Sequence, residues 1–156
     1  MPAPLSLVPY QTVEEQTEAV VRDGFVYLPG VLSTREIEVL RESMDSLEAM
    51  PDHFDRHQTE DSGGFLNKCI NNTFNRGQLY MDLIDRAGVI EVEEDIHGQD
   101  CHIIGMTAWL TGPGRPDQAL HVDWQPVNLP EDVLADERIQ LPVFITTAHY
   151  YLDDLT

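Results

Sequence analysis

The chain has 156 residues, 42 % of them hydrophobic and 24 % charged, which is ordinary for a soluble globular domain with one modest core. Its formal net charge of -19 repels phosphate groups, so we expect neither nucleic acid nor an anionic membrane surface as a partner. The sequence has no apolar run of the ~18 residues that a membrane span requires and no basic leader before an apolar core, so we expect a cytoplasmic protein.

The first part of the chain is expected to be helical around one short strand. Two capping boxes, each a Thr or Ser followed three residues later by Glu, predict the starts of two helices. These are Thr12 with Glu15 and Ser33 with Glu36. The first helix should end at Gly24, and the second should run over residues 34–50. Residues 25–28 between them are predicted to form a strand that ends at Pro29-Gly30.

The middle of the chain is expected to alternate loops with short helices. Residues 51–64 are polar and rich in Asp and His, which is typical of a loop. Asn75 and Gln78 suggest a capped third helix with the apolar residues Leu79, Leu83 and Ile84, and a further helix over residues 89–96 should stop at Gly98.

The second part is expected to be rich in strands. We predict a strand over residues 101–110, a Gly/Pro turn over 111–117, a strand from His121 to Trp124, an acidic loop over 126–137 and β-structure over 141–152. Helices therefore come first and strands follow. This order is typical of an α+β domain in which helices buttress a mostly antiparallel sheet or barrel.

Few residues point to covalent or redox chemistry. Lys68 is the only lysine, which leaves a Schiff-base mechanism a single candidate. Cys69 and Cys101 lie far apart and form no CxxC pair, so the sequence predicts neither a disulfide framework nor a structural zinc site. We expect both cysteines to be buried thiols.

His121 and Asp123 form the pattern that carries chemistry. Residues two apart in a strand point to the same face, so an imidazole and a carboxylate lie side by side. One further histidine completes a facial triad that holds Fe(II) and leaves positions for a bidentate keto acid and dioxygen. A chain with six His and 28 acidic residues contains about one H-x-[D/E] by chance, so the preceding strand and Gly/Pro turn are what favour a metal site.

A family resemblance extends over most of the chain. Residues 23–33 (DGFVYLPGVLS), the strand 103–110, the turn 112–114, the run 120–125 (LHVDWQ) and residues 141–156 follow one another in a characteristic order. In this order they resemble the phytanoyl-CoA dioxygenase-like family of Fe(II)- and 2-oxoglutarate-dependent oxygenases.

The resemblance implies a fold, a reaction and roles for residues. The fold would be N-terminal helices buttressing a double-stranded β-helix, or jelly-roll barrel. The reaction would oxidise, most often hydroxylate, a small molecule with O2, giving succinate and CO2. His121 and Asp123 carry over as Fe(II) ligands. The 2-oxoglutarate pocket would be lined by Thr107, Trp109 and His149, and the substrate entrance by Trp124 and Gln125. Since related halogenases lack the carboxylate, Asp123 favours hydroxylation, desaturation or cyclisation.

The chain also departs from the family. There, an NG turn, a PGSH segment, a distal histidine and an arginine that binds 2-oxoglutarate follow the phrase with which this sequence ends. None of them occurs in residues 1–156. The resemblance therefore implies the N-terminal half of a single oxygenase domain whose C-terminal barrel strands are missing. We expect this half to bind iron weakly and to turn over little, because an unfinished barrel exposes strand edges.

Other interpretations stay open. The half-barrel could be a non-catalytic domain that binds a ligand or a protein. A cupin-like metal isomerase would share the barrel but usually uses more histidines. His149 could act as the third metal ligand or as a packed core histidine, and Trp109 could be simple packing. The sequence reveals neither the substrate nor the oligomeric state.

Overall fold

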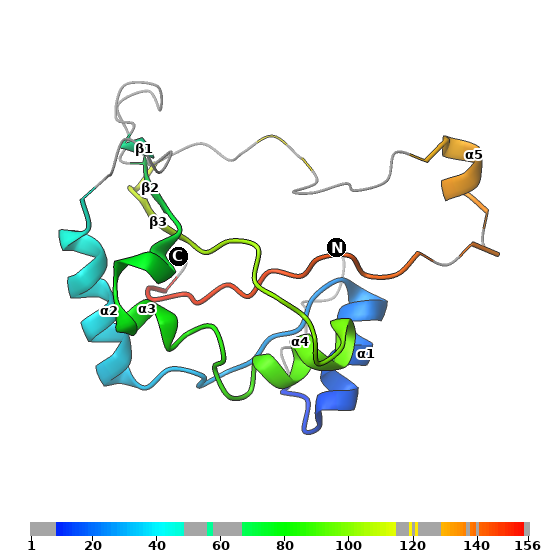
Figure 1. Ribbon diagram of the computed structural model, residues 1–156, viewed down its shortest axis with the longest axis horizontal. Helices are drawn as coiled ribbons and strands as arrows, with labels where there is room; N and C mark the ends of the chain where they lie inside the picture. The colour runs from blue at the N-terminus through cyan, green and yellow to red at the C-terminus, as the bar shows by residue number, and fades with distance from the viewer. Residues whose placement is uncertain are drawn as a thin grey trace.

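The computed structural model describes most of the chain (Figure 1). The described residues are 9–48, 56–57, 67–114, 119, 121, 129–136, 138–139 and 141–154. Their elements, in chain order, are α1 (Val13–Asp23), α2 (Thr34–Ser46), β1 (Arg56–His57), β2 (Asn67–Asn71), the 3-10 helix η2 (Thr73–Arg76), α3 (Gln78–Met81), α4 (Ile90–His97), β3 (Thr107–Thr111) and α5 (Glu131–Leu134).

The first two helices begin where the sequence predicts. The Thr12 hydroxyl accepts a hydrogen bond from the backbone N–H of Glu15 at 3.2 Å, and the Ser33 hydroxyl accepts one from Glu36 at 3.3 Å. Both capping boxes are therefore confirmed. Gly24 ends α1 with a left-handed φ of 82°, as its position predicted.

The C-terminus of α2 is capped from outside the helix. The helix ends at Ser46, earlier than predicted, and its last turn contains no basic residue. The Lys68 ammonium, only 9 % exposed, donates to the carbonyl oxygen of Met44 at 3.3 Å. Arg76 Nη1 donates to the carbonyl oxygen of Glu48 at 3.2 Å. Two cations from β2 and η2 thus face the negative end of the α2 dipole.

The sheet consists of three antiparallel strands in the order β1-β2-β3. Ile70 of β2 lies opposite Ala108 of β3, and both are buried. Lys68 shares this face because residues two apart in a strand point the same way, and its bond to α2 places the face against that helix. Cys69 and Trp109, opposite each other, lie on the other face. The Trp109 side chain is 45 % exposed there.

Buried side chains gather at two places. Figure 1 shows α1 beside α4 at one side of the molecule, and α2, α3 and the sheet at the other. The buried apolar residues of the first group are Ala19, Val89 and Val92; those of the second are Leu40, Cys69, Ile70, Tyr80 and Ala108. The Tyr80 hydroxyl lies 2.8 Å from the Ser43 hydroxyl, which ties α3 to α2.

Residues 141–154 cross the molecule and connect the two groups (Figure 1). Their polar contacts, in chain order, are Thr146 with α4, the Tyr150 hydroxyl with the carbonyl oxygen of Leu83 at 2.9 Å, and Asp153 with Arg41 of α2 at 3.0 Å. Burial raises the pKa of the Tyr150 hydroxyl above its usual value, so the phenol stays protonated and able to donate.

Several predicted strands are not formed. Residues 25–28 and 141–152 belong to no strand, and the strand expected over 101–110 is β3 at 107–111 alone. Apolar, β-branched composition is not sufficient for a strand, because a strand also needs a neighbour with which to exchange backbone hydrogen bonds. Of the strand expected over 121–124, His121 lies outside any strand and the rest lies outside the described residues.

Other elements differ from the prediction as well. The loop expected over 51–64 includes β1, and β2 was not predicted. Two short helices, η2 and α3, replace the predicted third helix, and the N-cap residue of α3, Gly77, provides no side-chain cap. The acidic loop over 126–137 contains α5, whose first turn holds Glu131 and Asp132 at the favourable end of the helix dipole.

The expected α+β organisation is present only in outline. Helices and an antiparallel sheet occur together, whereas the jelly-roll barrel and the single domain over residues 1–156 stay predictions. Within the ranges that the structure describes, no helix is both long and apolar enough to span a bilayer.

Candidate functional site

His121 is the one expected metal ligand that the structure describes. Its ring is exposed, and Nδ1 lies 2.7 Å from the carbonyl oxygen of Ala119. A carbonyl oxygen can only accept, so Nδ1 carries the proton and the lone pair of the neutral ring is on Nε2. Metal-binding histidines usually have this arrangement, in which one ring nitrogen donates to a carbonyl or carboxylate and the other binds the ion.

The other residues of the proposed motif lie outside the described residues. They are Asp123, expected to be the second ligand, and Trp124 and Gln125, expected at the substrate entrance. Their predicted roles therefore stay predictions.

Thr107 and Trp109, expected to line the 2-oxoglutarate pocket, share one face of β3. They lie two residues apart in the strand, on the face that does not pack on α2. The Thr107 hydroxyl donates to Asn71 Oδ1 at 3.1 Å, which links β3 to the end of β2. Both side chains are exposed, whereas Cys69, which lies opposite Trp109 on the same face, is buried.

His149, the third residue expected in the pocket, lies on the C-terminal segment. Its ring is exposed and stacks on Tyr151, with 6.0 Å between ring centroids and 19° between ring planes. No interaction joins His149 to Thr107 or Trp109 in the described structure. The structure thus places the three pocket residues on two separate segments without direct contact.

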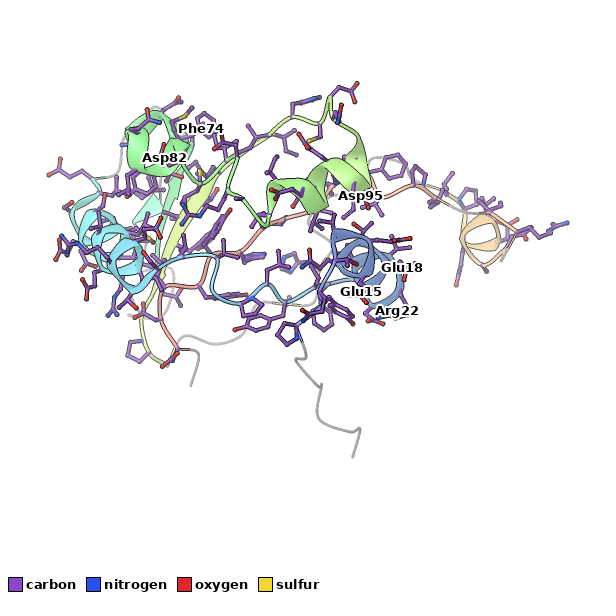
Figure 2. The ribbon with its side chains drawn as sticks, turned by 90° about the horizontal axis from the view of Figure 1, so that it is seen from below. Glu15, Glu18, Arg22, Phe74, Asp82 and Asp95 are labelled. Carbon is purple, nitrogen blue, oxygen red and sulfur yellow. The ribbon has the colours of Figure 1, made fainter. Side chains whose placement is uncertain are left out.

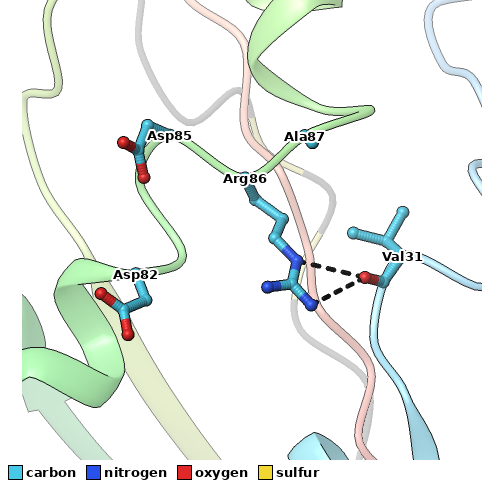
Figure 3. A pocket seen from close by; sticks show the side chains of 5 residues that line it. All are labelled: Val31, Asp82, Asp85, Arg86 and Ala87. Carbon is cyan, nitrogen blue, oxygen red and sulfur yellow. Dashed lines mark hydrogen bonds between the residues drawn. The ribbon is translucent and has the colours of Figure 1, made fainter.

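Arg86 connects the turn after α3 to the start of α2, and the sequence analysis missed it. Its Nε and Nη2 donate to the carbonyl oxygen of Val31 at 3.1 and 3.0 Å, and Nη2 donates to Glu36 Oε1 at 2.5 Å. Figure 3 shows the guanidinium turned toward Val31, with Asp82 and Asp85 across a shallow hollow of about 550 Å³. The Arg86 guanidinium is thus engaged with groups of residues 31 and 36.

Glu36 is held ionised by its surroundings. The Ser33 hydroxyl, at 2.6 Å, the Ser33 backbone N–H, at 2.8 Å, and the Arg86 guanidinium lower the pKa of Glu36 from 4.5 to about 2. One carboxylate thus completes a capping box and receives the guanidinium. The capping box was readable from the sequence, whereas the ion pair, which joins residues fifty positions apart, was not.

Glu93, His97 and Thr146 form a small polar cluster between α4 and the C-terminal segment. The Thr146 hydroxyl donates its single proton to Glu93, so His97 Nε2, 2.8 Å away, must donate to the hydroxyl oxygen. A catalytic triad places the histidine between the hydroxyl and the acid. Here the hydroxyl lies between the other two, so the cluster fastens segments together and does not activate a nucleophile. The i,i+4 spacing of Glu93 and His97 was the sequence pattern that could have indicated this cluster.

The surface of the described helices is acidic. Figure 2 shows Glu15 and Glu18 on α1 with Asp95 on α4, and all three side chains are exposed. Among the residues that the structure describes, no group of three His, Cys, Asp or Glu side chains is arranged to hold a metal ion.

Comparisons with family models, with curated proteins and with solved structures find no match for this chain.

Proposed function

We propose that this chain supplies two Fe(II) ligands, His121 and Asp123, to a 2-oxoglutarate-dependent oxygenase that oxidises a small molecule with O2. The products would be the oxidised substrate, succinate and CO2. The proposal is supported by the family-like order of motifs in the sequence and, above all, by the hydrogen bond from His121 Nδ1 to the Ala119 carbonyl oxygen.

The geometry of His121 fits a metal ligand. The bond from Nδ1 favours the tautomer whose Nε2 lone pair a divalent ion requires, and His121 is an exposed residue. A carboxylate two residues later adds the oxygen donor of a facial triad.

When bound, Fe(II) and 2-oxoglutarate supply the reaction with dioxygen, and the protein supplies ligation, orientation and exclusion of water. Thr107 and Trp109 would contribute one wall of the cofactor pocket from β3, and His149 would contribute another from the C-terminal segment. All three are exposed, and exclusion of water from such a pocket would depend on the residues that cover them.

Metal binding by the 156-residue chain tests the ligands. Fe(II) added without oxygen should bind weakly but saturably, and His121→Ala or Asp123→Ala should each weaken binding by at least about tenfold. The chain offers a matched control in Asp100 and His102, an exposed acid and histidine with the same spacing in reverse order. Asp100→Ala and His102→Ala should leave the affinity unchanged, whereas equal losses from both pairs would indicate only diffuse binding to an acidic surface.

Addition of 2-oxoglutarate to the anaerobic Fe(II) protein separates the proposal from its rivals. A visible charge-transfer band that is lost in His121→Ala but kept in His102→Ala indicates the chelate of an oxygenase. A missing band counts against 2-oxoglutarate as the cosubstrate when the protein tested also includes a distal histidine and an arginine for the keto acid, and saturable Fe(II) binding without a band would then favour a metal isomerase of the cupin type. If neither binding nor band occurs in such a protein, the oxygenase proposal fails and a non-catalytic domain that binds a ligand or a protein is the alternative.

A further inference from the structure

One nitrogen of the Arg86 guanidinium, Nη1, takes no part in the contacts that fasten the start of α2. A guanidinium has five N–H donors in a planar fork. Nε and Nη2 use three of them on the Val31 carbonyl oxygen and on Glu36, while no residue in the described part of the chain accepts from Nη1. In Figure 3 the nitrogen without a dashed line lies on the side of the fork that faces Asp82 and Asp85. Two donors of a side chain that is only 23 % exposed are thus turned toward the hollow.

Two carboxylates line the same hollow. Asp82 and Asp85 lie three residues apart on the turn after α3. Asp82 accepts a hydrogen bond from Gln78 Nε2 at 2.6 Å, whereas Asp85 makes no hydrogen bond or ion pair with any described residue. Neither carboxylate pairs with Arg86, whose ion pair among the described residues is with Glu36. Donors and acceptors therefore line one hollow without satisfying each other.

The charges around the hollow select the kind of ligand. Arg86 is one cation among three carboxylates, those of Glu36, Asp82 and Asp85, which leaves an excess of two negative charges. A simple anion such as phosphate is therefore repelled. An ammonium group alone would be attracted but would leave the Nη1 donors unused. A ligand that combines an ammonium group with a carboxylate satisfies both sides of the hollow.

We infer that this hollow binds a small zwitterion of the amino-acid type, its ammonium group between Asp82 and Asp85 and its carboxylate on Arg86 Nη1. The side chains of Val31 and Ala87, which also line the hollow, provide apolar surface for a short aliphatic group. The volume of about 550 Å³ lies within the range of small-molecule sites. Because the hollow is shallow and both aspartates are exposed, we expect weak binding, with a Kd near about 1 mM.

The turn that carries these charges is fixed before a ligand arrives. The N–H of Asp82 donates to the carbonyl oxygen of Gln78 at 2.9 Å, and the Leu83 carbonyl oxygen accepts from the Tyr150 hydroxyl at 2.9 Å. The Arg86 carbonyl oxygen accepts from two N–H groups at the start of α4, at 3.0 Å each. Little binding free energy is therefore lost in ordering the turn. The hollow shares no residue with the proposed metal site, so the inference goes beyond the proposed function and does not depend on it.

Titration of the isotope-labelled 156-residue chain with L-alanine at neutral pH, followed by amide NMR spectra, tests the inference. Saturable shifts are expected at residues 85–87. Two parts of the same molecule serve as control ligands, because ethylamine lacks the carboxylate and propionate lacks the ammonium group. Each should bind at least about tenfold more weakly than L-alanine, since each lacks one of the two charged contacts.

The matched variants are Asp85→Asn and Asp95→Asn. Asp85→Asn removes one carboxylate from the hollow, keeps the size of the side chain and breaks no contact of the described structure, so it should weaken L-alanine binding by at least about tenfold. Asp95 is an exposed aspartate of α4 outside the hollow, and Asp95→Asn changes the net charge equally but should leave the affinity unchanged. Arg86 itself is kept, because it also holds Val31 and Glu36. Circular dichroism verifies that both variants retain the fold.

Each result decides for or against the site. Saturable L-alanine binding that exceeds binding of both control ligands, and that is weakened by Asp85→Asn but not by Asp95→Asn, supports the inference. It is overturned if residues 85–87 do not shift at about 50 mM L-alanine, if either control ligand binds as tightly, or if the two variants have equal effects. Since Fe(II) binding by His121 is measured separately, failure of this site leaves the proposed function untouched.

Discussion

Replacing Arg86 should reveal how strongly the turn after α3 is fastened to the start of α2. The guanidinium, 23 % exposed, makes two hydrogen bonds to the carbonyl oxygen of Val31 and one to Glu36. Arg86→Met keeps most of the side-chain volume but leaves the Val31 carbonyl without these donors. A hydrogen bond from a charged donor contributes about 1.5–3 kcal/mol, so the variant should lose roughly that much stability.

Urea unfolding followed by far-UV circular dichroism measures this loss. The matched control is Arg35→Met, because Arg35 also pairs with a glutamate of α2, Glu38, but is 75 % exposed and, among the described residues, makes no hydrogen bond to a distant segment. The control should change stability by no more than about 0.5 kcal/mol. Arg86→Lys keeps the charge but not the paired donors, so it should fall between Arg86→Met and the parent protein. Equal losses in Arg86→Met and Arg35→Met would refute the assigned role.

Two further predictions concern ionisation and burial. The pKa of Glu36 is lower in the folded protein, about 2, than its ordinary 4.5, so its contribution to stability is present above pH 4.5 and is lost as the pH falls toward 2. The difference in unfolding free energy between parent and Glu36→Gln should therefore be constant at neutral pH and vanish near pH 2; a difference that persists there contradicts the assignment. Lys68 should react with an amine reagent at least about tenfold more slowly in the folded protein than in urea, because its ammonium is buried against Met44. As the only lysine it is identified by mass spectrometry, and equal rates would show that the contact is absent.

The helix starts could be predicted because their signals are local. The hydroxyl of Thr12 or Ser33 and the carboxylate three residues later belong to the same turn, so the sequence contains both partners of the capping box. Gly24 could be placed for the same reason. The start of α5 had a comparable signal in Glu131 and Asp132, which the surrounding prolines obscured.

The strands could not be predicted to the same degree because a strand depends on a distant partner. Residues 25–28 and 141–152 have strand-like composition but no ladder, whereas the unremarkable segment 67–71 is β2 because β3 lies beside it. The same difference between local and long-range contacts applies to the candidate site. The tautomer of His121 comes from a neighbouring carbonyl, two residues away, while the positions of Thr107 and His149 relative to each other depend on how far-separated segments pack.

The crossing of residues 141–154 also determines an order of folding. Each capping box closes within one turn, whereas Thr146 reaches Glu93 over 53 residues and Tyr150 reaches Leu83 over 67. Contacts between such distant positions must overcome the entropy of closing a long loop, so they form slowly. During synthesis the helices emerge from the ribosome well before the segment that connects them. The helices can therefore form before residues 141–154 are available to connect α4 and the turn after α3 with α2.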